Sequence, residues 1–208
     1  MYIIVYHATI NFRASPIQML LMDAGIDYTM EEPIWAPDRC VGTNPGMPVF
    51  APPVLKKGDF YLSQTSAIMN YLGEAHGYSP VGAEDKASCL QLVMDAGDIM
   101  AELFQIAKEA DKKAAFVDKR LLSWLLHFEK VFMKSGEEAS FLMGDKVTQA
   151  DFALLAAIES LDFSVGIDKV KEILPKCLAS WRATMEARPF FAGYLSQTKP
   201  SLFESMKA

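Results

Sequence analysis

The sequence predicts a small α/β domain over residues 1–78 and an all-helical domain over residues 84–208. Segments typical of strands and of helices alternate in the first third of the chain, which is the pattern of an α/β unit. The stretch HGYSPVG at residues 76–82 then interrupts the helical pattern with glycine, serine and proline, as a linker does. Beyond it strand signals nearly vanish, and the segments that favour helix are residues 84–108, 112–135, 148–163, 169–174 and 178–187.

The α/β domain begins with a predicted strand at residues 2–6, which are all β-branched or aromatic. A helix is expected to follow, because apolar residues recur there at helical spacing. Ser15 and Pro16 suit the N-cap and first position of that helix, and Gly25 suits its C-terminal cap. Residues 27–31 predict a second strand.

The rest of this domain is expected to be irregular at first and then regular. Residues 33–48 hold four prolines and two glycines, which argues against a helix or strand. Residues 53–63 predict a hairpin that turns at Gly58-Asp59. A helix is expected over residues 65–75, so the predicted order is β-α-β, an irregular stretch, then β-β-α.

The charge balance narrows the possible partners. The chain carries a formal net charge of -6 at pH 7, which argues against a nucleic-acid-binding face. The sequence contains no run of 18 apolar residues, so we expect no membrane-spanning helix. The apolar residues 1–6 are too few for a signal peptide. The cysteines, Cys40, Cys89 and Cys177, form no Cys-x-x-Cys pair, so we expect no disulfide framework and no zinc site, and a reducing cytoplasm as the setting.

One stretch of the helical domain has a direct physical interpretation. In GDKVTQAD, residues 144–151, Thr148 is expected to be the N-cap of a helix. Asp151, three positions later, can return a hydrogen bond to the cap backbone, while Val147 and Phe152 suit a hydrophobic staple. The helix that follows is apolar on all sides, which predicts burial. Asp151 is therefore expected to stabilise the fold and not to take part in catalysis.

Residues 51–65 combine the predicted hairpin with the start of a helix. Gln64 stands eleven positions after Pro53 and is followed by Thr65 and an Ile-x-x-Tyr-Leu pattern. Free N–H groups at such a helix N-terminus, with polar side chains beside them, form a ready site for a carboxylate. An ordinary hairpin followed by a capped helix is the alternative interpretation of the local pattern.

This segment resembles the glutathione site of the glutathione transferases. The pattern around Thr148 and Asp151 resembles the folding signature of their C-terminal domain, and Trp181-Arg182 with the Arg-Pro-Phe run at residues 188–190 resembles the end of that domain. These motifs occur in the family's order over about the whole chain. The resemblance implies the glutathione transferase fold, in which a thioredoxin-like α/β N-terminal domain, here without redox cysteines, precedes an all-α C-terminal domain.

Within that family the chain resembles the tyrosine-type classes, which are alpha, mu, pi and sigma. The resemblance implies that the hydroxyl of Tyr6, at the end of the first strand, donates a hydrogen bond to the glutathione thiolate. Ser15 is the alternative donor, since serine-type classes place one at the start of the first helix. Thr9 and Asn11 are minor candidates.

The other glutathione-binding residues are implied by their positions in the family pattern. Gln64 and Thr65 match the pair that holds the γ-glutamyl carboxylate, and Arg13 would lie near the charged ends of the peptide. Trp35 and Arg39 are expected at the glycyl end.

Pro52 departs from the family pattern. The residue before the family's cis-proline gives both a backbone N–H and a backbone C=O to the cysteinyl part of glutathione, and Pro52 has no N–H. Pro53 matches the cis-proline by its spacing to Gln64, although a shifted loop with the cis bond between Ala51 and Pro52 is the alternative. One lost neutral hydrogen bond costs about 0.5–1.5 kcal/mol.

The implied function is a cytoplasmic transferase for detoxification that joins glutathione, its co-substrate, to small apolar electrophiles without a metal. The electrophile would meet residues 7–12, 94–105 and 202–203, and Asp95 and Asp98 lie where some classes hold the γ-glutamyl amine. A homodimer is expected, with neither nucleic acid nor membrane as a partner. The alternatives are a non-catalytic ligand-binding or structural protein of transferase type and a glutathione-dependent isomerase or peroxidase.

Overall fold

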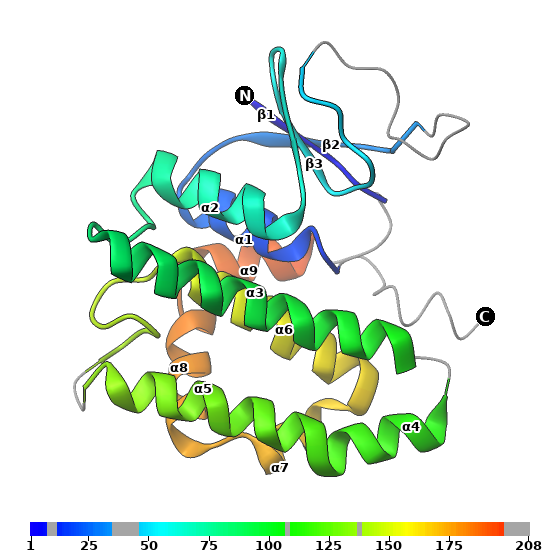
Figure 1. The fold of residues 1–208 in the computed structure, drawn as a ribbon, viewed down its shortest axis with the longest axis vertical. Helices are drawn as coiled ribbons and strands as arrows, with labels where there is room; N and C mark the ends of the chain where they lie inside the picture. Colours follow the sequence, from blue (N-terminus) through cyan, green and yellow to red (C-terminus); the bar gives the residue numbers. More distant parts are fainter. Residues whose placement is uncertain (8–11, 35–45, 107–108, 137–138, 198–208) are drawn as a thin grey trace.

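The computed structural model describes the chain at residues 1–7, 12–34, 46–106, 109–136 and 139–197. Figure 1 shows a small sheet at one end of the molecule and two helices, α1 and α2, between it and the remaining helices. One continuous hydrophobic core runs from Tyr2 in the sheet to Tyr194 in the last helix. The predicted fold class is confirmed, whereas the division between residues 78 and 84 stays a prediction, because no break in the core marks it.

The sheet has four strands in the order β2-β1-β3-β4. β1 pairs in parallel with β2, while the β1–β3 and β3–β4 pairs are antiparallel. A parallel pair needs a crossover connection, which α1 provides, and Gly58 with φ 59° turns the β3–β4 hairpin. The strands are β1 (Tyr2–Val5), β2 (Tyr28–Glu31), β3 (Val54–Lys57) and β4 (Phe60–Ser63).

The first two helices, α1 (Ser15–Asp23) and α2 (Thr65–His76), pack against each other and against the helical part of the chain. α1 begins one residue earlier than predicted, with Ala14 as its N-cap and Ser15 as its first helical residue. The Ser15 side chain is buried and makes no capping hydrogen bond, so tertiary packing overrides its local preference. Gly25 follows α1 with φ 65°, as expected of a residue that ends a helix.

The remaining elements are helical. The predicted helix at residues 112–135 is a run of three segments, in which a π-helical stretch, η1, joins α4 to α5. The sequence analysis did not predict the final helix, which starts at Pro189. These elements are α3 (Ala83–Ile106), α4 (Ala110–Ala115), η1 (Phe116–Leu121), α5 (Leu122–Lys134), α6 (Gln149–Val165), α7 (Ile167–Ile173), α8 (Lys176–Glu186) and α9 (Pro189–Ser196).

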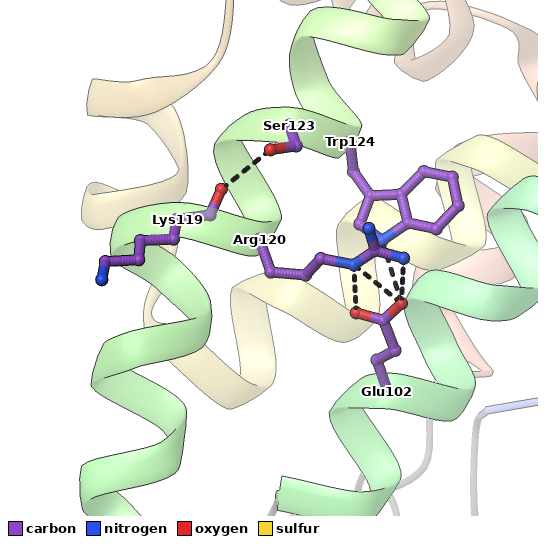
Figure 2. Close-up of polar contacts among 5 residues, drawn as sticks. All are labelled: Glu102, Lys119, Arg120, Ser123 and Trp124. Atoms are coloured by element: carbon purple, nitrogen blue, oxygen red, sulfur yellow. Dashed lines mark hydrogen bonds and ion pairs between the residues drawn. The ribbon is translucent and has the colours of Figure 1, made fainter.

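The π-helical stretch carries an arginine that ties it to α3. Figure 2 shows Arg120 between the carboxylate of Glu102 and the indole of Trp124. Arg120 Nη2 donates to Glu102 Oε1 at 2.7 Å, Arg120 Nε donates to Glu102 Oε2 at 3.0 Å, and the guanidinium lies 4.8 Å from the ring centroid of Trp124. Such a two-pronged pair with a stacked ring is more specific than an ordinary surface ion pair. It therefore helps to fix the C-terminal half of α3.

The N-terminus of α6 is closed by Asp151, which is fully buried. Its carboxylate accepts hydrogen bonds from the backbone N–H groups of Leu142 (2.9 Å) and Thr148 (2.8 Å), from the Thr148 hydroxyl (3.0 Å) and from Trp181 Nε1 (2.8 Å). Burial raises the pKa of Asp151, and the hydrogen bonds act in the opposite direction. The predicted capping box is present, and its carboxylate also holds two segments outside the helix.

Asp23, the last residue of α1, joins the two ends of the chain. Its carboxylate, 4% exposed, receives both Arg188 Nε (2.8 Å) and Arg188 Nη2 (2.6 Å). The hydroxyl of Tyr78 donates to the same carboxylate at 2.7 Å. A buried charge is stable only when it is paired and hydrogen-bonded, and Asp23 meets both conditions.

Candidate functional site

A pocket of about 160 Å³ lies between the N-terminus of α2 and the middle of α3. One wall comes from the loop before α1 and from the start of α2, and the other wall is one face of α3. The lining residues are Arg13, Gln64, Thr65, Ser66, Val93, Met94, Gly97, Asp98, Met100 and Ala101. Three of the predicted glutathione-binding residues therefore meet in one cavity, although they come from two separate parts of the sequence.

Gln64 has an unusual backbone at the edge of this pocket. With φ 73° and ψ 115° it is the one residue other than glycine with a positive φ in the described part of the chain. Such a conformation costs of order 1–3 kcal/mol and is typical of functional sites. Gln64 is also the N-cap of α2, and its side chain makes no capping hydrogen bond. The amide N–H groups of the first turn are thus left for a ligand.

Thr65 and Arg13 are connected directly. The Thr65 hydroxyl donates a hydrogen bond to the backbone carbonyl of Arg13 at 3.0 Å, across 52 positions of sequence. The Arg13 side chain is exposed, and its guanidinium lies 6.0 Å from the ring centroid of Phe12. None of the described carboxylates forms an ion pair with Arg13. The positive charge is therefore available to an anionic ligand.

Tyr6 lies just beyond β1 and is buried, with 4% exposure. Its backbone N–H donates to the carbonyl of Glu31 at 2.9 Å, which extends the β1–β2 pairing. Burial raises the pKa of Tyr6 to about 12, while a hydrogen bond to the Arg13 backbone and the Arg13 charge act in the opposite direction. The phenol is therefore a neutral hydrogen-bond donor at physiological pH. Tyr6 does not line the pocket, but Arg13 connects it to the pocket.

Ser15, the alternative donor, lies elsewhere. Its side chain is 4% exposed and neighbours the hydroxyl of Tyr194 in α9. It is not among the residues that line the pocket. The hydroxyl therefore packs between helices, on the side of α1 that contacts α9.

The predicted cis bond lies between Pro52 and Pro53, so the alternative at Ala51–Pro52 is not adopted. Pro53 is buried and Pro52 half-buried beside it, at the entry to β3. Neither proline lines the pocket between α2 and α3.

Several predicted positions lie outside the described residues. These are Thr9, Asn11, Trp35, Arg39 and residues 202–203. The expected glycyl end of the site and the expected electrophile contacts at the chain's end therefore stay predictions.

The pocket also uses residues that the sequence analysis did not single out. Ser66 adds a hydroxyl next to Thr65, and Gly97 and Ala101 line the wall formed by α3. A Cβ built on Gly97 meets no atom within 4 Å, so the residue borders open space. Two small residues four positions apart on one helix face are a signal that the sequence contained, since that spacing places them side by side.

The charges of the pocket suit a zwitterion. Arg13 and the open α2 N-terminus favour a carboxylate on one wall, because both present positive charge or partial charge. Asp98 supplies a negative charge on the α3 wall. An amino-acid head group, with a carboxylate and an ammonium on one carbon, carries this pair of charges. None of the described helices is long and apolar enough to span a membrane, and no cluster of metal-binding side chains occurs among the described residues.

Comparisons with known proteins find similarity to glutathione S-transferases. Residues 97–198 match the family model described as "Glutathione S-transferase, C-terminal domain". The chain is 29% identical over 167 residues to glutathione S-transferase P 1 of Xenopus laevis, covering 76% of both chains. It is 26% identical over 198 residues to glutathione S-transferase P 10 of Caenorhabditis elegans, covering 94% of this chain and 91% of that one. The solved structure of the Onchocerca volvulus pi-class glutathione S-transferase aligns with a TM-score of 0.79 at 20% identity, over 100% of this chain and 95% of that chain.

Proposed function

We propose that this chain, a member of the glutathione S-transferase family, is a cytoplasmic enzyme that conjugates glutathione to small apolar electrophiles. The observation that carries the proposal is the pocket between α2 and α3, in which Arg13 and the uncapped α2 stand opposite the α3 wall that bears Asp98. Its charges are those needed for the γ-glutamyl end of glutathione, which is an amino-acid head group.

The γ-glutamyl end of glutathione is held mainly by opposite charges on its carboxylate and its ammonium group. Its carboxylate accepts from the first amide N–H groups of α2 and pairs with Arg13, while its ammonium group lies toward Asp98. Gln64 and Ser66 add side-chain hydrogen bonds around the same carboxylate. Each hydrogen bond to a charged group contributes about 1.5–3 kcal/mol.

Tyr6 then acts on the sulfur. A free thiol has a pKa near 8.5, so only a few per cent is ionised at pH 7. Lowering that pKa by roughly two units requires about 2.7 kcal/mol of preferential thiolate binding. The Tyr6 hydroxyl stays protonated because its own pKa is raised to about 12. It therefore remains a donor to the thiolate over the working pH range, which makes it a better candidate than the Ser15 hydroxyl that packs against α9.

One observation favours a second candidate function. Pro52 has no N–H to donate to the cysteinyl backbone, so one hydrogen bond of the family pattern is missing. A weaker hold on that part of the peptide suits a non-catalytic ligand-binding or structural protein of transferase type. An isomerase or peroxidase that uses glutathione would share the first site and differ only in its second substrate.

Calorimetric titration with glutathione and an aromatic-halide conjugation assay separate these functions. We expect binding together with turnover of the aromatic halide. Binding without turnover of halide, isomerisable or peroxide substrates would favour the non-catalytic protein. Absence of binding would overturn both functions.

We propose a homodimer as the working assembly. Large apolar side chains are exposed near the hairpin and on α3, with Met47 at 75%, Phe50 at 67% and Met94 at 55% exposure. Exposed apolar surface of this kind marks protein–protein contact. Lys56 and Asp95 are already paired within the chain, with Glu31 and His127, so apolar contact is the better basis for the interface. Light scattering should give a mass near twice 23.1 kDa, and a monomer at micromolar concentration would contradict the proposal.

A further inference from the structure

The hydroxyl of Thr65 has only one proton to donate. That proton is directed to the backbone carbonyl of Arg13, with an oxygen–oxygen distance of 3.0 Å. Only oxygen lone pairs are then left toward the pocket, and lone pairs repel a carboxylate. While this bond exists, the hydroxyl of Thr65 cannot also donate to a bound carboxylate.

The backbone of Arg13 is held from both sides. Its carbonyl accepts from the Thr65 hydroxyl, and its backbone N–H donates toward the hydroxyl oxygen of Tyr6, which opposes the rise of the Tyr6 pKa. The next residue, Ala14, is the N-cap of α1. The long side chain of Arg13 is exposed and has no ion-pair partner among the described residues. Its direction therefore depends on how firmly its own backbone is fixed.

We propose that Thr65 is a positioning residue, whose hydroxyl fixes the backbone of Arg13. With that backbone fixed, the guanidinium of Arg13 lies in the pocket and the Arg13 backbone keeps its hydrogen bond with Tyr6. This inference rests on the proposed glutathione site and changes the role of one residue in it. The carboxylate is bound by the α2 amide N–H groups and by Arg13, and Thr65 acts on it through Arg13.

The choice of threonine fits this role. A β-branched side chain at the start of a helix has few χ1 rotamers, so its hydroxyl has few directions to choose from. Serine in the same place would carry the same donor with more freedom. Thr65→Ser should therefore keep most of the effect, whereas Thr65→Val keeps the shape and removes the donor.

A first experiment needs no ligand. Hydrogen–deuterium exchange of the amides at residues 12–15 should be several-fold faster in Thr65→Val than in wild type, and close to wild type in Thr65→Ser. Equal exchange in all three proteins would overturn the positioning role. Because this measurement uses the free protein, its result is independent of whether glutathione binds. If the valine variant does not fold, Thr65→Ala provides the same comparison.

A second experiment is a double-mutant cycle of Thr65→Val and Arg13→Leu with glutathione as the titrant. Thr65→Val alone should weaken binding about threefold to tenfold, the size of one neutral hydrogen bond. In the Arg13→Leu background the same change should have almost no further effect, because residues that act through one another are not additive. Fully additive losses would show that Thr65 contacts the ligand directly and would overturn the proposal.

The pH profile of conjugation gives a third readout. Since Arg13 also contacts Tyr6, Thr65→Val should move the thiolate limb of the kcat/KM profile to higher pH, and Thr65→Ser should restore it. A merely structural role would lower the amount of folded protein and leave the profile in place. Wild-type protein that binds no glutathione would overturn the proposed function, and the exchange experiment would still decide the role of Thr65.

Discussion

The N-termini of α2 and α6 present the same physical problem and solve it in opposite ways. In α6 the helix start is closed by the chain itself: the N3 amide meets the Thr148 side chain, and the buried Asp151 carboxylate accepts from the N-cap backbone N–H and from three other donors. In α2 the N-cap side chain makes no capping hydrogen bond, no acidic residue lies in the first turn, and Gln64 holds a strained backbone beside a pocket. The carboxylate that stabilises α6 is built in, and the one that suits α2 has to arrive with a ligand. A helix N-terminus can therefore contribute to stability or to ligand binding, depending on whether the anion beside it belongs to the chain or to a ligand.

The largest expected effect is at the closed helix end. Asp151→Ala leaves the N–H of Leu142 and the indole N–H of Trp181 buried without a partner, so we expect a loss of about 3–5 kcal/mol of stability. Thermal unfolding should show a midpoint lower by roughly 10 °C. Turnover per folded molecule should not change. The exposed Asp145→Ala is the control, and a stable but inactive Asp151 variant would contradict the structural role.

Glu159, a half-buried carboxyl on the same helix, lacks the set of backbone hydrogen bonds that Asp151 receives. Burial raises the pKa of Glu159 to about 7; Tyr194 and Arg182 oppose that rise, and Asp162 and Glu186 add to it. Because the folded-state pKa lies above the ordinary value, the folded protein keeps a proton that the unfolded chain loses. Stability is therefore lost as pH rises from about 4.5 to about 7.

Glu159→Gln should remove this loss, because a neutral amide does not ionise. Relative to wild type, the variant should gain about 2 kcal/mol in denaturant unfolding at pH 8 and little at pH 4. Glu172→Gln, on the surface, should give no such pH-dependent gain. A gain for Glu159→Gln of the same size at both pH values would point to packing instead of protonation.

A carboxylate added to the open helix end should make α2 resemble α6. In Ser66→Asp the new charge occupies the first turn and repels the ligand's carboxylate, so glutathione affinity should fall by about 2 kcal/mol, or roughly thirtyfold. The melting temperature should stay the same or rise slightly, since an acid near a helix N-terminus contributes about 0.3–1 kcal/mol. Calorimetry and thermal melts check the two effects, with Ser66→Asn as the uncharged control. If the Ser66→Asp variant bound glutathione with unchanged affinity, the proposed position of the glutathione carboxylate at the α2 N-terminus would be wrong.

The smallest effect concerns the sulfur. Tyr6→Phe removes a donor from the thiolate but leaves the charged clamp in place, so the thiol pKa in the complex should rise by about one unit, equivalent to about 1.4 kcal/mol. Glutathione affinity measured well below that pKa should change little. The pH dependence of kcat/KM gives the pKa, and Tyr61→Phe on β4 serves as control. An unmoved pKa would transfer the donor role to another group, with Ser15→Ala as the next variant.

The contrast between the two helix ends also explains which features were predictable. The α6 cap was predicted because Thr148 and Asp151 are three positions apart and the capping chemistry is local. The polar start of α2 was predicted for the same reason. By contrast, the bond from Thr65 to Arg13 spans 52 positions, and the α3 wall at Gly97 belongs to another part of the chain, so both depend on tertiary packing.

Two differences in secondary structure have the same origin. Serine is a favoured N-cap residue, but Ser15 is the first residue inside α1 because its side chain is buried beside Tyr194. Residues 112–135 were predicted as one helix, yet the π-helical η1 interrupts it where Arg120 meets Glu102 and Trp124. Periodicity predicts that a helix exists, and long-range contacts decide its local register.

The pairing of Asp23 with Arg188 has a consequence for the order in which the molecule is completed. The two residues are 165 positions apart, so α1 obtains the partner for its buried carboxylate only after the segment that carries Arg188 has also been synthesised. Contacts of such long sequence separation form late, because their loop-closure entropy is recovered only when the intervening chain has folded. The side of α1 that α9 covers is therefore completed only after the chain between Asp23 and Arg188 has folded.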